Sequence, residues 1–538
     1  MISLNKTIID ALLPLGAIPK PEQKKAIECL LKGKNALCLM PTGSGKSFVY
    51  QYVAAHLGKT ALVLSPLRAL MLQQDEIMSR SGFTSSALHR VTDYKKYNRV
   101  LCQYAKEGLP QFLYISPERS ASDGFLAHVL KKQRDRIGLI VVDEAHCISQ
   151  WGDTFRPLYR LIPAFLNDVF GSSYWPPILC LTATLKTEDE TEICRIFNIQ
   201  KTAVVRSPLL RRTNINISVE TLSDQDHKER RLEKLLKAHA GEKVIVYAHL
   251  VKGQYGTRSL NQQFRDKGFT CDYFDAAATE AHKVDVLNGF STGRIPIIFA
   301  TSAFGMGMHI PDIRVVVHYL LPESIEQYYQ EIGRAGRDGL PSHAYLLFTE
   351  TNLKVRRFLI RRSLPTASQL DKIYENNFAP SSPIPLANYD PYRDNSENSP
   401  ELSVFVALLE AGVLQVRSKG VSNIKSFTPT GKRIAQFRTY LNVSRIGALS
   451  KIATVMKQDP SIIVEDLYRG IVDGTLLISA APKKVLFYTH AKSYQASRDP
   501  IVQDFATKRE RREDGFEELV SVIQSSDPEA GIYSYLKI

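Results

Sequence analysis

The stretch Met40-Pro-Thr-Gly-Ser-Gly-Lys46-Ser47 follows the apolar run 35–39, and it decides the expected fold. A glycine-rich turn between a buried strand and a helix aims successive backbone N–H groups inward, where they and the helix dipole attract phosphate. Lys46 adds a point charge for the β- and γ-phosphates, and the Ser47 hydroxyl is a ligand for Mg²⁺. The pattern therefore predicts a nucleotide-binding loop in an α/β domain, made of Met40, Pro41, Thr42, Gly43, Ser44, Gly45, Lys46 and Ser47.

A second motif, Asp143-Glu144-Ala-His146, follows the apolar run 139–142 in the same way. At the end of a strand, Asp143 is placed to hold the metal shell, and Glu144 is placed to orient and deprotonate an attacking water. A glycine-rich turn that binds no nucleotide is the alternative for the first motif, and the presence of both motifs argues against it. Together they predict an enzyme that binds and hydrolyses a nucleoside triphosphate.

The amino-acid composition and net charge indicate what kind of protein this is and what kind of partner it binds. Of the 538 residues, 44% are hydrophobic and 23% are charged, which is typical of globular domains. The net charge of +14, from 69 Lys and Arg against 55 Asp and Glu, favours a polyanionic partner such as nucleic acid, although a soluble basic protein fits the charge equally well. The sequence has no apolar run of about 18 residues, so we expect neither a transmembrane helix nor a membrane partner.

The cysteines indicate an intracellular protein. All seven lie at or before Cys271, singly and without the spacing of metal ligands, so they are expected to be small buried hydrophobes. Because no cysteine follows Cys271, a thiolate zinc site is not expected in the chain beyond it, and zinc is not a predicted cofactor. The expected compartment is the cytoplasm, with nucleoid association if the chain is prokaryotic.

Short apolar runs alternate with helical stretches in two successive blocks, which is typical of parallel sheets covered on both faces. In the first block, residues 1–206, the runs are 61–64, 112–115, 139–142 and 178–181. In the second block, residues 207–350, they are 244–247, 273–274, 297–300, 315–317 and 345–348. Two tandem α/β domains fit this pattern better than one large sheet, and ligands are then expected at the carboxyl ends of the strands.

The second block carries Gln330-Glu-Ile-Gly-Arg334-Ala-Gly-Arg337-Asp-Gly339. The planar fork of arginine suits the charge that spreads over a γ-phosphate during its transfer. Alone, such a stretch is as often a solvated basic surface. Behind a nucleotide site in the preceding domain, it predicts arginine fingers that close over the nucleotide from the second domain, so that hydrolysis opens and closes the cleft.

The longer stretch Asp-Glu-Ala-His146-Cys-Ile-Ser-Gln-Trp151-Gly-Asp-Thr-Phe155-Arg156-Pro-Leu-Tyr159 resembles the signature of RecQ helicases, in superfamily 2. The segments 64–68, 114–119, 182–184, 300–307 and 328–339 resemble further motifs of that family, in the same order. The resemblance covers about residues 19–348. It implies two RecA-like motor domains, ATP and Mg²⁺ as cofactors, and movement from 3′ to 5′ on single-stranded DNA with unwinding of the duplex ahead.

The resemblance also implies roles for single residues. Gln23 would read the adenine base, Gln330 would belong to the catalytic set with both arginines, and threonines 182 and 184 would link nucleotide state to DNA grip. An aromatic loop would sense DNA and trigger hydrolysis, although aromatics that merely close the sheet edge are the alternative. The implied DNA-coupling set is Arg68, His146, Trp151, Phe155, Arg156, Tyr159, Thr182, Thr184, Thr301 and Ser302.

Several features depart from the family pattern. Asp153-Thr154 stands where RecQ proteins typically have His-Asp, which puts the coupling of DNA binding to hydrolysis in question. His309 stands where Asp or Asn usually contacts the ribose, and the segment 247–252 matches the family poorly. The four-cysteine zinc module that normally follows the motor is missing.

The remaining chain predicts smaller units. Residues 351–400 form a helical bridge, with a basic segment 354–362 that is a solvated helix or a DNA contact, and a Pro-rich linker. Residues 401–500 predict winged-helix-like units, with hairpins 413–417/424–427 and 475–479/485–489. Their basic tips, Lys419 and Lys483-Lys484, would split the duplex, or the units would only brace the motor. Residues 501–538 predict a charged helical tail.

The expected function is that of an ATP-dependent 3′ to 5′ DNA helicase in DNA repair, recombination or genome defence. Its partner would be single-stranded or tailed duplex DNA, and RNA fits less well. A DNA-stimulated ATPase that acts as a translocase or switch in a larger complex, without strand separation, is the alternative. The motor is expected to be a monomer, and a protein partner could replace the missing zinc module.

Overall fold

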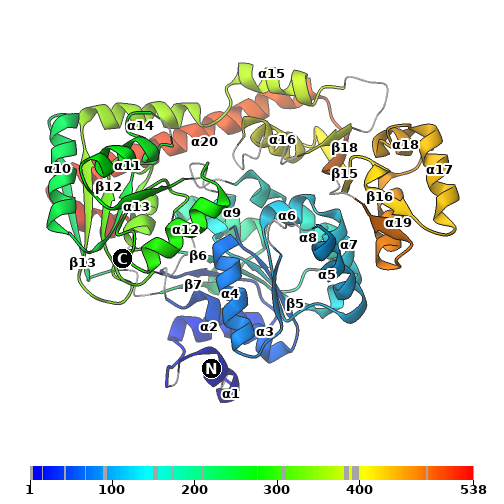
Figure 1. Ribbon diagram of the computed structural model, residues 1–538, viewed down its shortest axis with the longest axis horizontal. Coiled ribbons are helices and arrows are strands. Elements are labelled where there is room, and N and C mark those ends of the chain that lie inside the picture. The colour runs from blue at the N-terminus through cyan, green and yellow to red at the C-terminus, as the bar shows by residue number, and fades with distance from the viewer. Residues whose placement is uncertain are drawn as a thin grey trace.

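The computed structural model of this chain describes residues 4–14, 16–41, 44–66, 68–88, 94–149, 156–172, 174–183, 185–207, 211–251, 253–275, 277–304, 310–380, 387–390, 399–479 and 483–536. Figure 1 shows two lobes, each built on a sheet, and a third module of helices and small sheets that lies against the first lobe.

The first lobe is a seven-stranded sheet in the order β3-β4-β2-β5-β6-β1-β7, and every neighbouring pair is parallel. Its strands are β1 (Ala36–Leu39), β2 (Thr60–Leu64), β3 (Ser85–Leu88), β4 (Phe112–Ile115), β5 (Ile137–Val142), β6 (Ile178–Thr182) and β7 (Val204–Arg206). Its main helices are α1 (Lys6–Leu12), α2 (Pro21–Leu31), α3 (Lys46–Leu57), α4 (Arg68–Arg80), α5 (Tyr94–Glu107), α6 (Pro117–Ser122), α7 (Gly124–Lys132), α8 (Ile162–Phe170) and α9 (Thr187–Ile196). All residues of β1, β2, β4 and β6 are buried, as expected of strands covered on both faces.

The second lobe is a six-stranded parallel sheet in the order β10-β11-β9-β12-β13-β8. Its strands are β8 (Ile215–Thr221), β9 (Lys243–Tyr247), β10 (Cys271–Phe274), β11 (Ile297–Ala300), β12 (Ile313–His318) and β13 (Ser342–Phe348). Its helices are α10 (Gln225–Ala238), α11 (Thr257–Asp266), α12 (Glu280–Ser291) and α13 (Ile325–Ile332). The predicted pair of RecA-like parallel-sheet domains is confirmed, and each expected apolar run lies in a strand. None of the described helices has both the length and the apolarity needed to cross a bilayer.

A bridge of two helices leads into the third module, which holds antiparallel sheets in the orders β14-β18-β15 and β16-β17. The bridging helices are α14 (Glu350–Arg362) and α15 (Ala367–Asn377). The module contains α16 (Pro400–Glu410), α17 (Arg433–Val443), α18 (Leu449–Val455), α19 (Pro460–Val472), β14 (Ala387–Tyr389), β15 (Leu414–Val421), β16 (Phe427–Pro429), β17 (Leu476–Ile478) and β18 (Lys484–His490).

The two predicted hairpins are wrong, because their strands pair with more distant partners. β15 pairs with β18, and β16 pairs with β17. Gly420, expected in a turn, lies inside β15, where a Cβ would come within 2.7 Å of Val464 Cγ2 and 2.9 Å of Phe487 Cε2. The glycine thus permits close packing of the strand, and a single sequence pattern cannot distinguish that use from a turn.

The basic residues assigned to the hairpin tips dock the module onto the first lobe. Lys419 Nζ donates to the Ser120 carbonyl at 2.8 Å, and Lys484 forms an ion pair with the buried Asp123. The apolar core is continuous across this contact, with the rings of Phe125 and Tyr468 5.4 Å apart. In this structure Lys419 and Lys484 therefore brace the motor, which was the alternative to a role in splitting the duplex.

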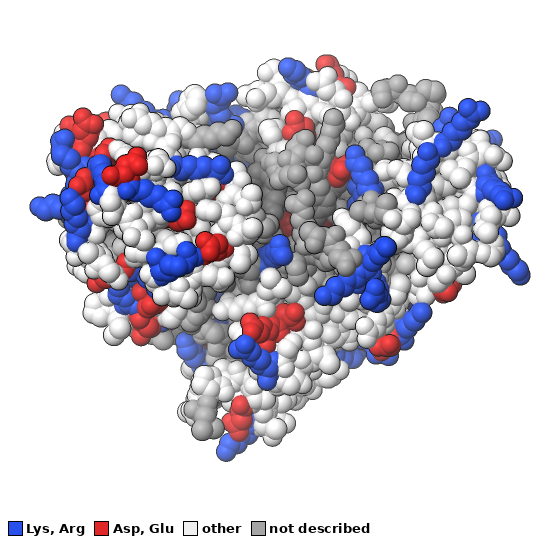
Figure 2. Space-filling model, in the orientation of Figure 1, with Lys and Arg blue, Asp and Glu red and all other residues white. Residues whose placement is uncertain are grey.

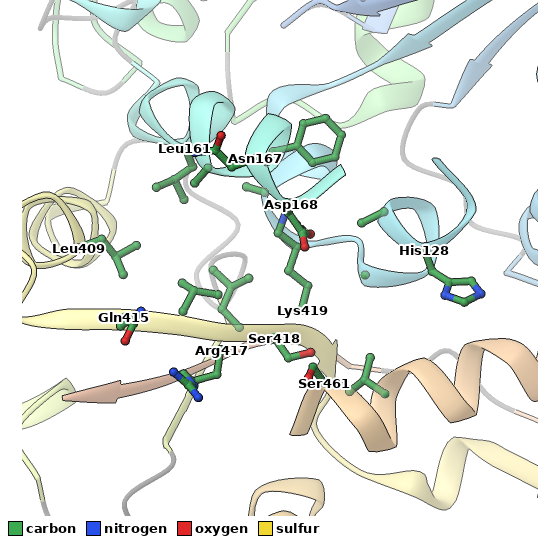
Figure 3. A pocket seen from close by; sticks show the side chains of 18 of the residues that line it. His128, Leu161, Asn167, Asp168, Leu409, Gln415, Arg417, Ser418, Lys419 and Ser461 are labelled. Carbon is green, nitrogen blue, oxygen red and sulfur yellow. Dashed lines mark ion pairs between the residues drawn. The ribbon is translucent and has the colours of Figure 1, made fainter. Parts of the chain in front are cut away.

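A cavity of about 510 Å³ lies in this docking interface, between α7 and α8 on one side and β15 and α19 on the other. Figure 3 shows the Lys419 side chain reaching from β15 toward Asp168 of α8, and the two charged groups are 3.7 Å apart. Burial, opposed by Asp168, lowers the pKa of Lys419 to about 8. The cavity is remote from the nucleotide loop, and its described acids and bases are largely paired with each other.

The predicted tail contains a long helix that packs against both the third module and the second lobe. The charged helical tail expected over residues 501–538 consists of most of α20 (Tyr494–Ile523) and of α21 (Pro528–Leu536). Phe505 of α20 packs in the third module, whereas Phe516 packs in the core of the second lobe, so α20 joins the two (Figure 1). Arg357 of α14 pairs with Glu517 of α20 at 2.7 Å, so this part of the basic segment is an internal contact.

Candidate active site

The nucleotide loop lies at the carboxyl end of β1, as expected from the sequence. The Met40 N–H donates to the Thr182 carbonyl at 3.0 Å, which ties the start of the loop to the end of β6. Gly45 has φ +83°, and a Cβ there would lie 2.8 Å from Gln23 Nε2, so the position requires glycine. Lys46 and Ser47 follow at the first turn of α3. Thr42 and Gly43 lie outside the described residues.

Gln23 is bound to this loop. Its amide nitrogen donates to the carbonyls of Ser44 at 3.3 Å and Gly45 at 3.0 Å, and its amide oxygen accepts from the Lys20 N–H at 2.8 Å. The side chain is buried, and it holds α2 against the loop. Adenine recognition by Gln23 stays a prediction.

Asp143 and Glu144 lie at the carboxyl end of β5. The Asp143 N–H donates to the Leu64 carbonyl at 2.9 Å, and its carboxylate accepts from the Ser65 hydroxyl at 3.2 Å. Glu144 has φ +49°, a left-handed conformation that costs about 1 kcal/mol or more for a residue with a side chain. Such strain is typical of functional sites, and here it occurs at a carboxylate that lies 3.3 Å from His146 Nδ1.

The two carboxylates differ in their electrostatics. Burial, followed by the charge of Glu144, raises the pKa of Asp143 to about 6. Burial acts on Glu144 as well, but the positive charges of Lys46, Arg334 and Arg337 hold its pKa below the usual value. Glu144 is therefore ionised at neutral pH, as a general base must be. Both arginines belong to the second lobe, so charges from both lobes act on Glu144.

Both lobes carry buried polar atoms without partners in the segments of the two motifs. Among the described residues, the Ser44 hydroxyl, Gln330 Nε2 and Arg334 Nε are buried and have no hydrogen-bond partner. Burial, and then the charge of Arg334, lowers the pKa of the Arg337 guanidinium to about 9, so positive charge is crowded here. Buried donors normally have acceptors, and these donors, from both lobes, fit a polyanionic ligand such as a nucleoside triphosphate.

A chain of contacts leads from Glu144 to the end of β6. His146 Nδ1 lies 3.3 Å from Glu144 Oε2 and 3.0 Å from the Thr182 hydroxyl. Burial lowers the pKa of His146, which keeps the ring neutral at pH 7. His146 and Thr182 are thus placed to connect the base to the nucleotide loop, because the Thr182 carbonyl accepts from Met40.

The other residues of the implied DNA-coupling set lie in several different places in the structure. Tyr159 is a correction, since its ring is fully buried and its hydroxyl donates to the Asp143 carbonyl at 2.9 Å, so it supports the backbone at Asp143 and cannot stack a base. Arg156 pairs with Glu118 at 3.0 Å. Arg68 is exposed at the start of α4, and Thr301 and Ser302 follow β11. Trp151, Phe155, Thr184, Asp153, Thr154 and His309 lie outside the described residues.

The sequence patterns did not identify Arg212 and Asn214. Their side chains bind backbone carbonyls of residues 333–337, the segment that carries Arg334 and Arg337 and is called the arginine loop below. Arg212 donates to the carbonyls of Gly333 at 3.2 Å and of Ala335 and Gly336, both at 2.8 Å. Asn214 Nδ2 also donates to the Gly336 carbonyl at 2.8 Å. No motif marks these residues, because their role is to satisfy backbone carbonyls more than a hundred positions away.

Arg212→Ala is expected to lower kcat for ATP hydrolysis by about 10²-fold with little change in KM, because a small displacement of the arginine loop weakens transition-state contacts. Arg212→Lys should restore little, since one ammonium cannot bridge three carbonyls. The matched control is Arg211→Ala, whose guanidinium lies over the Tyr533 ring at 4.6 Å. Steady-state kinetics of the folded variants measure this, and equal losses in both variants would contradict it.

The pKa of Asp143 predicts how Mg²⁺ binding depends on pH. A carboxyl must be ionised to ligate a metal, so the apparent Mg²⁺ affinity should be flat above the pKa of about 6 and fall about tenfold per pH unit below it. Ser65→Ala should move this inflection to higher pH, because the Ser65 hydrogen bond lowers the pKa of Asp143. Mg²⁺ titrations of ATP hydrolysis at several pH values measure both, and an inflection that Ser65→Ala leaves in place would contradict the assignment.

Comparison with known proteins places this site in a family. Residues 20–193 match the DEAD/DEAH box helicase family, and residues 227–339 match the helicase conserved C-terminal domain. Among solved structures, the chain is similar to Mycobacterium smegmatis helicase Lhr bound to ssDNA and AMP-PNP, with a TM-score of 0.53 and 19% identity over 77% of this chain and 58% of that one. It is also similar to S. cerevisiae Dbp5 bound to RNA and ADP BeF3, with a TM-score of 0.51 and 16% identity over 66% of this chain and 91% of that one. At these identities the likeness shows the fold alone.

Curated relatives are more similar in sequence. The ATP-dependent DNA helicase RecQ of Bacillus subtilis is 34% identical over 343 residues, which are 63% of this chain and 56% of that protein. The probable ATP-dependent DNA helicase RecS of the same organism is 34% identical over 65% of this chain and 68% of its own length. The chain thus spans about half to two thirds of these relatives. With its parallel sheets, nucleotide loop and arginine loop, the chain belongs to the RecQ-like family of DEAD/DEAH-box helicases.

Proposed function

We propose that this chain is an ATP-dependent DNA helicase that moves 3′ to 5′ on single-stranded DNA and unwinds the duplex ahead. The observation that carries the proposal is the composite site, in which an ionised Glu144 on one lobe faces Arg334 and Arg337 on the other. A site divided between two lobes couples hydrolysis to their relative movement. That movement is the step a translocating motor needs.

The residues have distinct roles in this proposal. Lys46 and the loop N–H groups hold the phosphates, and Glu144 takes the proton of the attacking water. Arg334 and Arg337, with Gln330 beside them, stabilise the charge that develops on the γ-phosphate. Ser47 and Asp143 would hold Mg²⁺, which would neutralise part of the charge of the phosphates.

The charge of the third module supports a nucleic-acid substrate. In residues 423–475, all of which the structure describes, Asp473 is the one exposed acid, and Figure 2 shows mainly Lys and Arg on this module. The exposed bases there are Lys425, Lys432, Arg438, Arg445, Lys451, Lys457 and Arg469. Such a surface suits a phosphate backbone. DNA is proposed over RNA because the RecQ and RecS relatives are named DNA helicases, although a mimivirus relative at 32% identity is named a putative RNA helicase.

The test combines two assays on the full chain. ATP hydrolysis is measured with and without single-stranded DNA or RNA of one sequence, and unwinding is measured on duplexes with a 3′ or a 5′ tail. Hydrolysis stimulated by DNA, with unwinding of the 3′-tailed duplex alone, is expected. Stimulation without unwinding would favour the translocase or switch, and stimulation by RNA alone would overturn the choice of DNA.

The finer expectations belong to the same proposal. The motor would act as a monomer on tailed DNA in DNA repair, recombination or genome defence, in the cytoplasm or at the nucleoid. The braced third module would stand where RecQ proteins carry a cysteine zinc module, and a protein partner could supply what that module does.

A further inference from the structure

Two histidines and a glutamate meet at the carboxyl edge of the second sheet, outside the catalytic set. His318 Nε2 lies 2.7 Å from Glu331 Oε2, and His249 Nε2 lies 3.3 Å from the same oxygen. One nitrogen or oxygen of each residue lies within 4.8 Å of the others. The side chains are 0%, 0% and 3% exposed for His249, His318 and Glu331, so the cluster is sealed from bulk solvent.

The fold builds this cluster from three elements. His318 ends β12, His249 lies just past the end of the neighbouring β9, and Glu331 projects from α13. His249 has φ +56°, a left-handed conformation in which a residue with a side chain is strained. His249 lies in the segment 247–252, which resembles the RecQ pattern poorly.

We propose that His249, His318 and Glu331 form a binding site for one divalent transition-metal ion of the Zn²⁺ type. Two imidazoles and a carboxylate are ligands that Zn²⁺ accepts, whereas Mg²⁺ prefers oxygen ligands alone. With metal–ligand bonds of about 2.0–2.2 Å, the ligand atoms of a tetrahedral site lie about 3.3 Å apart. The two contacts to Glu331 Oε2 are 2.7 and 3.3 Å long and all three ligand atoms lie within 4.8 Å of one another, so small side-chain movements bring them to that geometry.

Metal binding replaces one proton in this arrangement. The hydrogen bond between His318 and Glu331 places a proton between the two ligand atoms. That proton moves to His318 Nδ1 or to solvent when the metal takes its place. His318 Nδ1 is buried and has no hydrogen-bond partner among the described residues, so the second-shell acceptor typical of tight sites is missing and a modest affinity is expected.

An ion in this site would connect α13 to β9 and β12. Glu331 directly follows Gln330 and precedes Arg334 by three residues, so the ion would fix the part of α13 that leads into the arginine loop. Metal binding itself does not rest on the proposed function, and its test needs no ATP and no DNA.

The experiment titrates the metal-free full chain with Co²⁺ and with Zn²⁺. One equivalent of Co²⁺ is expected to give the intense visible absorption of a low-symmetry site, and Zn²⁺ should displace it and raise the unfolding temperature. His249→Asn should weaken binding by more than about 10-fold, because losing a ligand costs more than losing a second-shell partner. Asn tolerates the left-handed backbone, so this variant should fold. The control His282→Asn, at a half-buried histidine 3.6 Å from Asp272, should bind normally.

A second measurement does not depend on any variant. X-ray absorption of Zn²⁺ bound to the unmodified chain counts its ligands, and two imidazoles with oxygen are expected. A sulfur ligand, a single imidazole, or binding that His249→Asn leaves unchanged would overturn the proposal. No stoichiometric binding by the folded, metal-free chain would overturn it as well.

Discussion

Glu144→Gln is expected to slow ATP hydrolysis about 10³-fold while ATP still binds, because an amide cannot take the proton of the attacking water. The change keeps the size of the side chain and removes only its negative charge. The pKa of Glu144, lowered by Lys46 and the two arginines, makes it an ionised base at neutral pH in the wild type. Single-turnover hydrolysis beside equilibrium ATP binding measures the two effects separately.

The matched control for this variant is Glu118→Gln. Glu118 is also buried and pairs with Arg156 at 3.0 Å, but it lies outside the set of charges that acts on Glu144. It should retain most of the basal hydrolysis measured without DNA. Near-normal turnover in Glu144→Gln would remove Glu144 as the base, and loss of ATP binding would show that its charge organises the site.

Arg337→Ala is expected to lower kcat by about 10³-fold or more, which is the contribution typical of an arginine finger. The guanidinium lies beside Arg334 in a buried, positively charged place that an anion would stabilise. Arg337→Lys should recover little of the loss, because an ammonium cannot make the paired hydrogen bonds of a planar fork. KM for ATP should change far less than kcat, since the contact forms mainly in the transition state.

The control for Arg337 is Arg357→Ala. Arg357 pairs with Glu517 on α20, away from the cleft, so its loss removes a partly exposed ion pair worth at most about 1 kcal/mol. Hydrolysis by this variant should remain within a few-fold of wild type. If Arg337→Ala changes turnover no more than Arg357→Ala does, the arginine finger would be assigned to another residue.

The sequence alone predicted the two parallel sheets, because strands buried on both faces are continuous apolar runs such as 139–142. It also predicted where Lys46, Asp143 and Glu144 lie, since each motif directly follows such a strand. It missed β3, β7 and β8, because Ser-Ser-Ala-Leu, the three-residue β7 and the alternating β8 lack a continuous apolar run of four residues. The local sequence pattern therefore predicts strands that are buried along their whole length, and it misses short, edge or half-exposed strands.

Tertiary structure alone decided features that depend on distant partners. Lys419 and Lys484 are indistinguishable in sequence from solvated bases, yet they reach Ser120 and Asp123 of the first lobe. Arg212 holds carbonyls of a loop far along the chain, and Tyr159 turned out to be buried. The physical reason is that hydrophobic periodicity records whether a residue is buried. The partner of a charged or aromatic side chain is set by how separate elements pack.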